Sequence, residues 1–163
     1  MRSIISAGVV AGLLAGVIFG IMMQMMSAPA PGGRQVPMML MVAMVVKSGS
    51  LAVGWLYHLF NSAVIGGIFG WLGGRRVQGR LGAGAGWGAL YGLAWWILGA
   101  LILMPVLLGM PAFAPLGMPP MRPVAMGSLV GHLIFGVVLG IGFAWLRRRA
   151  QERGVAPAER LAR

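Results

Sequence analysis

Four long stretches without a charged side chain constrain this chain more than any other feature of its sequence. They run from about Ile4 to Met26, Ser50 to Leu72, Leu81 to Leu108 and Val124 to Leu146. A helix needs about 20 apolar residues to cross a bilayer, so each stretch is long enough. Only 9% of the residues are charged, whereas a soluble domain carries about a quarter. The sequence predicts an all-α integral membrane protein with four spans.

We expect the first stretch to be a membrane span that is retained and not a leader that is cleaved. Its apolar run is longer than the 7–15 residues or so that are typical of a cleaved leader. Glycine also recurs in it at every fourth residue from Gly8 to Gly20, which is typical of a packed membrane helix.

The basic residues predict which way the spans point. With four spans, ten of the 13 Lys and Arg residues fall on one side, and only Arg34, Lys47 and Arg122 fall on the other. Because cytoplasmic loops are enriched in Lys and Arg, we expect both termini in the cytoplasm. We expect a single membrane domain over residues 1–149 and a basic tail over 150–163. Since the basic residues sit at span ends, the expected partner is the lipid bilayer and not nucleic acid.

An internal repeat organises the spans. The segment from His58 to Leu72 matches the segment from His132 to Leu146 at seven of fifteen positions, including a His, a Phe and a Trp. Equivalent positions are 74 residues apart in these two segments. They are 76 residues apart in the spans that precede each segment. The sequence therefore predicts two tandem two-span hairpins, over about 4–74 and 81–148, related by an axis along the membrane normal.

Small residues indicate which helix faces pack. They recur four residues apart and so share a face, as in a glycine zipper. The predicted packing positions are Gly8, Gly12, Gly16, Gly20, Gly66, Gly70, Gly136 and Gly140. Steps of four residues from His58 and from His132 reach small residues on the same helix face. We therefore expect both histidines to face the interior of a four-helix bundle.

The two loops that join the spans within each hairpin are rich in proline yet apolar. Val36–Val46 is too short to span and reads as an interfacial or re-entrant helix. The stretch from Met110 to Met121 cannot form one continuous helix, because prolines interrupt it.

Several classes of chemistry are excluded. No carboxylate precedes Glu152, which excludes paired-carboxylate catalysis and carboxylate proton relays within the membrane. The chain has no cysteine, so thiol nucleophiles and Cys-ligated metals are absent. No serine lies in a recognisable nucleophile turn. We therefore expect no enzymatic activity.

His58 and His132 are the candidate cofactor-binding residues, with two interpretations left open. Each imidazole can be a structural hydrogen-bonding group that fixes the register of neighbouring helices, in which case no cofactor is present. Alternatively, two equivalent histidines can ligate haem b or a chlorin from either side.

Methionine offers another candidate site, because 14 of the 163 residues are Met. Many lie near the two histidines in the predicted topology. Soft thioethers together with imidazole suit Cu(I), so His58, His132, Met38 and Met41 form a candidate copper site. The alternative is that methionine fills irregular packing gaps.

Three segments resemble a known family. They are His58-Leu-Phe-Asn-Ser-Ala-Val, the Gly88–Pro105 helix ending in Pro-Val-Leu-Leu-Gly-Met-Pro, and Gly131-His-Leu-Ile-Phe-Gly. In these the chain resembles the YagU-type family of small bacterial inner-membrane proteins. The resemblance implies an inner-membrane location and a link to acid tolerance, and it supplies no catalytic residues.

These observations together favour a non-enzymatic accessory or stress-related membrane subunit, alone, as a homo-oligomer or in a larger membrane complex. The alternatives are a haem- or chlorin-binding redox protein that uses His58 and His132, and a Cu(I)-binding or transport protein that uses Met and His.

Overall fold

The computed structural model describes residues 2–29 and 33–160, and it is mostly helical. Four helices are long and apolar enough to cross a membrane, over Ile4–Met25, Leu51–Gly74, Leu81–Leu107 and Pro119–Arg153. The predicted helical class and the four candidate spans are therefore confirmed. The first three spans agree with the predicted ones to within two residues at each end, and the fourth is longer.

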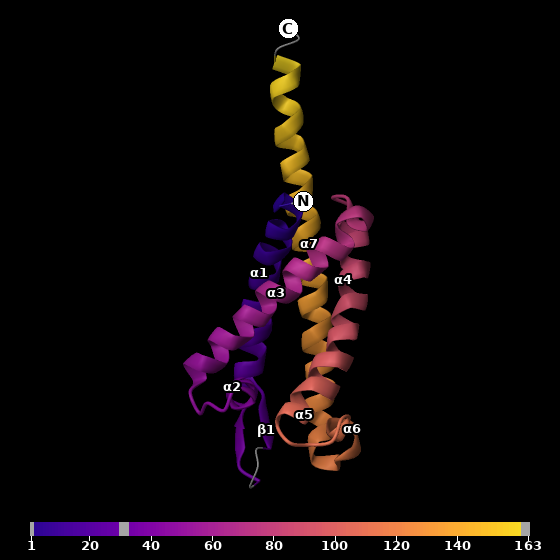
Figure 1. Ribbon diagram of the computed structural model, residues 1–163. Helices are drawn as coiled ribbons and strands as arrows, with labels where there is room; N and C mark the ends of the chain where they lie inside the picture. Colours follow the sequence, from indigo (N-terminus) through magenta and orange to yellow (C-terminus); the bar gives the residue numbers. More distant parts are fainter. Residues whose placement is uncertain (1, 30–32, 161–163) are drawn as a thin grey trace.

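The first half of the chain is a pair of crossing helices, α1 (Arg2–Met25) and α3 (Leu51–Val77) (Figure 1). They are joined by two short strands, β1 (Ser27–Pro29) and β2 (Gln35–Pro37), and by α2 (Met38–Val45). The strands pair antiparallel, with Ser27 opposite Pro37. The short helix agrees with the segment predicted over Val36–Val46, whereas the strand pair was not predicted.

The third span changes its helix type halfway along. The α-helix α4 (Leu81–Trp95) continues as a π-helix, η1 (Trp96–Leu103), and then as α5 (Met104–Leu107). Pro105 has no N–H, so it cannot give the Leu101 carbonyl the bond that an α-helix would supply. The N–H of Phe113 donates to that carbonyl instead, at 2.6 Å, and this bond holds the following loop against the span.

The return to the fourth span passes through two short turns, α6 (Ala114–Gly117) and the 3₁₀ helix η2 (Pro119–Met121). This agrees with the prediction that prolines prevent a continuous helix here. Helix α7 then runs from Arg122 to Arg160.

Helix α7 extends into the basic tail predicted over residues 150–163. It continues well past the membrane-spanning part, to Arg160 (Figure 1), while residues 161–163 lie outside the described residues. Ala, Arg, Gln and Glu in this segment are strong helix formers. The Arg148 guanidinium also pairs with Glu152 one turn later at 3.0 Å, which supports the helix by a few tenths of a kcal/mol.

Glycines allow α1 and α3 to touch backbone to backbone. A Cβ added to Gly12 would lie 2.8 Å from the Cα of Gly66, closer than real side chains approach. Gly8 and Gly70 also lie close together, since a Cβ added to Gly70 would lie 3.3 Å from the Cα of Gly8. Gly16 faces Ser62, where an added Cβ would overlap the side chain.

Helices α4 and α7 meet in the same way. A Cβ added to Gly88 would lie 3.2 Å from the Cα of Gly140, and one added to Gly136 would lie 3.0 Å from the Cα of Gly92. Of the eight predicted packing glycines, six lie at these two backbone contacts, and Gly16 lies against the Ser62 side chain. Gly20 differs, because it lies against the rings of Trp55 and His58.

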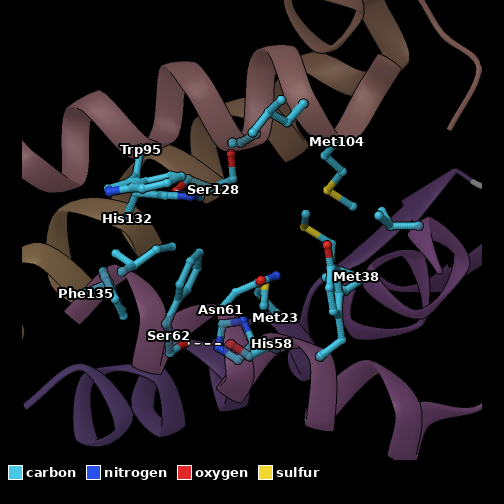
Figure 2. A pocket seen from close by; sticks show the side chains of 18 of the residues that line it. Met23, Met38, His58, Asn61, Ser62, Trp95, Met104, Ser128, His132 and Phe135 are labelled. Atoms are coloured by element: carbon cyan, nitrogen blue, oxygen red, sulfur yellow. Dashed lines mark hydrogen bonds between the residues drawn. The ribbon is translucent and has the colours of Figure 1, made fainter. Parts of the chain in front are cut away.

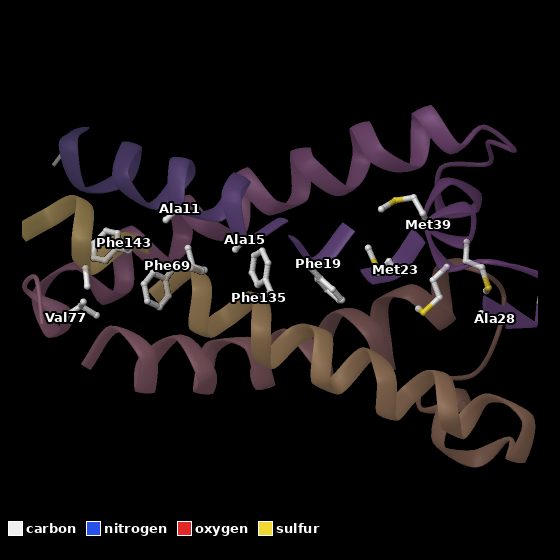
Figure 3. Close-up of a cluster of buried hydrophobic side chains, with 14 of the residues drawn as sticks. Ala11, Ala15, Phe19, Met23, Ala28, Met39, Phe69, Val77, Phe135 and Phe143 are labelled. Atoms are coloured by element: carbon white, nitrogen blue, oxygen red, sulfur yellow. The ribbon is translucent and has the colours of Figure 1, made fainter. Parts of the chain in front are cut away.

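A row of aromatic side chains fills the space between the two helix pairs (Figure 3). Phe69 of α3 contacts Phe143 of α7 edge to face, with ring centroids 5.5 Å apart. Phe69 also contacts Tyr91 of α4, at 5.2 Å. Ala11 and Ala15 of α1 are fully buried beside this row, so α1 and α7 form the main contact between the pairs.

The outward faces are strongly apolar. Leu14, Leu56, Phe60 and Leu90 each expose 60% or more of their surface. A soluble monomer rarely exposes apolar surface on this scale, whereas lipid would cover it in a multi-pass membrane protein.

Candidate functional site

A cavity of about 260 Å³ lies where α3 diverges from the third span (Figures 1 and 2). Its walls come from α1, α2, α3, the α4–η1–α5 span and α7. The lining is mainly apolar, and both His58 and His132 contribute to it. The two histidines that the sequence singled out therefore share one cavity, although they are 74 residues apart in the chain.

His58 ties α3 to α1. Its side chain is 8% exposed, and its Nε2 lies 2.8 Å from the backbone carbonyl of Gly16. A carbonyl oxygen can only accept a hydrogen bond, so Nε2 carries the proton. In the neutral imidazole, Nδ1 is then a hydrogen-bond acceptor.

His132 bonds within its own helix. Its Nδ1 lies 2.7 Å from the carbonyl of Ser128, so by the same reasoning Nδ1 is protonated and Nε2 is the acceptor. The two histidines thus adopt opposite tautomers. Sequence similarity alone would not distinguish these roles, because the residues around them match.

Each imidazole keeps one acceptor nitrogen available. Within residues 2–29 and 33–160, no protein group hydrogen-bonds Nδ1 of His58 or Nε2 of His132. Neither atom is completely enclosed by protein, in contrast to the buried and unpaired Nε of Arg147. The cavity therefore presents two unused hydrogen-bond acceptors.

One aromatic ring contacts both imidazoles. The Phe19 centroid lies 5.8 Å from that of His58 and 4.8 Å from that of His132, in edge-to-face arrangements. Trp55 meets His58 from another side, at 6.3 Å. Phe19 was not among the predicted site residues, because its sequence position shows only that it is apolar.

Hydroxyl and amide groups complete the polar part of the cavity. Ser62 donates to the His58 carbonyl at 2.8 Å, as the dashed line in Figure 2 marks. Ser128 accepts from the Trp96 indole at 3.1 Å and donates to the Ala125 carbonyl at 2.9 Å. Asn61 lines the cavity between them and makes no hydrogen bond among the described residues.

The predicted copper residues do not all meet. Met38 lines the cavity with His58 and His132, but Met41 does not. Met41 instead lines a second, smaller void of about 30 Å³, which Met38 also borders. In the described part of the chain, no three His, Cys, Asp or Glu side chains gather as metal ligands.

Methionine is frequent in the lining of the small void. Five methionines from four segments line it: Met38 and Met41 of α2, Met104 of α5, Met110 of the following loop, and Met121 of η2. Met38 and Met104 also border the larger cavity, where Figure 2 shows them on facing walls. The sequence identified the bias towards methionine but not which of these residues converge.

Comparisons with protein families, with curated proteins and with solved structures found no match for this chain.

Proposed function

We propose that this chain is a multi-pass protein of the bacterial inner membrane that acts as a small, non-enzymatic accessory or stress-related subunit by binding a lipid-soluble ligand. The observation that carries the proposal is the cavity between the helix pairs, which presents two unused acceptor nitrogens within an apolar lining. No carboxylate occurs before Glu152 to orient either histidine for proton transfer, which favours binding over catalysis.

Matching backbone contacts support an origin by duplication of one hairpin. In the first helix pair, an added Cβ on Gly12 would meet the Ser62 carbonyl and the Gly66 Cα. In the second pair, one on Gly88 would meet the Gly136 carbonyl and the Gly140 Cα. The repeat spacings relate every member of one set to its counterpart in the other.

The distribution of positive charge supports a cytoplasmic location for both termini. At the end of the bundle where α3 leads into α4, the Arg76 guanidinium lies 5.0 Å from the Trp87 ring centroid. The Arg149 guanidinium lies 4.3 Å from that of Trp145. Trp and Arg are typical anchors at the boundary between lipid and cytoplasm.

Reporter fusions test this orientation. We expect fusions after Arg80 and after Arg163 to report the cytoplasm, and a fusion after Arg34 to report the opposite side. A fusion after Arg163 that reports the outside would overturn the proposed topology.

A lipid-soluble photolabel, trifluoromethyl-phenyldiazirine, tests the binding role. We expect it to modify buried cavity residues such as Phe135, which is 4% exposed, when the protein is in vesicles. Gly99→Phe should reduce this labelling, because the cavity borders Gly99 and an added Cβ there meets nothing closer than 3.9 Å.

Gly86→Phe is the matched control, since nothing lies within 4 Å of an added Cβ on Gly86 and the residue does not line the cavity. Labelling confined to the outer helix faces, or unchanged by Gly99→Phe, would contradict a lipid-accessible binding cavity.

Cu(I) binding is a second candidate function, favoured by the five methionines around the small void. A space of about 30 Å³ can hold one ion, and thioethers prefer Cu(I). A water molecule would find few partners there, because Ser128 already uses its hydroxyl in two hydrogen bonds.

Metal analysis after exposure to Cu(I) under reducing conditions tests this candidate. We expect one bound ion, lost in Met41→Leu and in Met121→Leu but retained in Met25→Leu, whose side chain is 82% exposed. Binding that survives both void substitutions, or that requires His132 instead, would exclude the methionine site.

Haem or chlorin binding is less favoured by the contacts of the imidazoles. Nε2 of His58 is engaged by Gly16, and Phe19 contacts both rings where a macrocycle would have to insert. A Soret band that is lost in His132→Ala would restore this alternative.

A further inference from the structure

The chemistry of the cavity identifies a class of ligand, on the premise that binding is its function as proposed above. We propose that it takes a neutral, lipid-soluble aromatic alcohol, a phenol or hydroquinone, whose hydroxyl donates to Nε2 of His132. The argument rests on the tautomers, the neighbouring polar groups, the charge balance and the aromatic walls.

The tautomers require a ligand that donates a hydrogen bond. The carbonyls of Gly16 and Ser128 fix the protons of His58 and His132 on the nitrogens that face them. What remains unpaired on these two cavity-lining residues is a lone pair on each ring, which repels a ketone or ether oxygen. Nε2 of His132 lies at the tip of its ring, away from its own backbone, and is therefore the better placed of the two acceptors.

A hydroxyl suits the polar groups better than other donors do. It can donate to His132 and also accept from the Asn61 amide, which has no protein partner in the described part of the chain. An alcohol therefore satisfies both groups with a single atom.

Ligands of either charge, positive or negative, are disfavoured. The cavity lining has no carboxylate to balance an ammonium group, and no Lys or Arg to balance an anion. Burying an unpaired charge in an apolar site is costly, so a neutral molecule is preferred.

The walls favour an aromatic ring. Phe19, Tyr57, Trp95 and Phe135 line the cavity, and Figure 2 shows Trp95 beside His132. Aromatic pairs contribute about 0.5–1.5 kcal/mol beyond the area they bury. The cavity, at about 260 Å³, lies just below the range of roughly 300–1,000 Å³ for drug-sized ligands. A single substituted ring is therefore a better match than a macrocycle.

Competition between two nearly identical probes and the diazirine label tests the proposal. Para-pentylphenol and para-pentylanisole share a ring and a tail, but methylation removes the donor from the anisole. We expect the phenol to suppress labelling of the cavity at a concentration about tenfold lower than the anisole requires, as for one hydrogen bond.

His132→Leu should bring the two probes to the same potency, while Val130→Leu should leave the preference intact. Val130 lies on the same helix, is 52% exposed and does not line the cavity. His132 bonds only within α7, so its loss should leave the contact between helices in place, and a melting curve checks this.

The outcomes separate the two proposals. If the label enters the cavity but the anisole competes as well as the phenol, the ligand class is wrong. If the preference for the phenol persists in His132→Leu, His132 is not the acceptor. In both cases the cavity remains a binding site. If the label never reaches the cavity, the proposed function fails with it.

Discussion

Single hydrogen bonds have unusual structural importance in this molecule, because few polar groups lie within the spans. The Tyr91 hydroxyl of α4 donates to the Ile65 carbonyl of α3 at 2.8 Å. The Trp96 indole of the π-helix donates to the Ala125 carbonyl of α7 at 3.1 Å. Hydrogen bonds between membrane helices contribute about 0.6 kcal/mol on average and reach about 1.7 kcal/mol. They fix relative helix positions more than they add stability.

Removing the Tyr91 hydroxyl tests the bond between α3 and α4. We expect Tyr91→Phe to lower the free energy of unfolding by about 0.6–1.7 kcal/mol, because the ring packing is kept and only the bond is lost. Unfolding in mixed detergent measures this difference. Tyr57→Phe is the control, since the Tyr57 hydroxyl has no bond in the described part of the chain and should change stability little. Equal effects of the two substitutions would show that the bond to Ile65 contributes nothing.

The two histidines should respond differently to truncation. His58→Ala removes a bond between helices, whereas His132→Ala removes one within a helix. We expect the first to destabilise the protein more, by about 0.6–1.7 kcal/mol from the bond alone. Unfolding both variants under identical conditions shows which one loses more stability. A larger loss of unfolding free energy for His132→Ala would contradict these assignments.

At the scale of elements, glycine backbone contacts explain how the helices pair. In lipid no hydrophobic effect drives helices together, so close packing of backbones supplies much of the attraction. Gly88 lies against Gly136 and Gly140, while Gly86, two residues earlier, has nothing within 4 Å of an added Cβ. The same helix therefore carries one glycine that is required and one that is not.

This pair gives a matched test of the packing. We expect Gly88→Ala to destabilise the protein by about 1–3 kcal/mol, because its methyl group would overlap the Gly136 carbonyl. Gly86→Ala should be neutral or slightly stabilising, since alanine favours the helix by about 0.5–1 kcal/mol. Thermal melting of both variants measures these changes in stability. Equal stability of Gly88→Ala and the parent would mean that α4 does not lie on α7 as described.

The elements also show what a sequence can predict here. Uncharged length located the four candidate spans, because it is a local pattern. Four-residue spacing singled out eight glycines, of which six lie against the backbone of a neighbouring helix. The π-helix was not predicted, since its apolar sequence does not distinguish it from the α-helix that precedes it. The β1–β2 pair was likewise missed, because its prolines suggested only a loop.

At the scale of the whole molecule, the arrangement of the helix pairs creates the candidate site. Both histidines were identified from the repeat, yet the contact of Phe19 with both rings and the five-methionine void depend on how α1, α2 and α7 meet. These are contacts between distant segments, so no local pattern reveals them. The arrangement of the pairs, with α1 against α7, is therefore the central claim.

A disulfide between α1 and α7 tests that claim most directly. A Cβ on Gly142 would lie 3.4 Å from the Cβ of Ala11, close to the roughly 3.5–4.5 Å of a disulfide. The natural chain has no cysteine, so any bridge must come from the introduced pair. Ala11→Cys with Gly142→Cys should form an intramolecular disulfide in membranes, detected as a mobility shift that reductant reverses. Leu13→Cys with Gly142→Cys should not, because Leu13 lies on the opposite, more exposed face of α1. Efficient bridging in the Leu13 pair and none in the Ala11 pair would contradict the account.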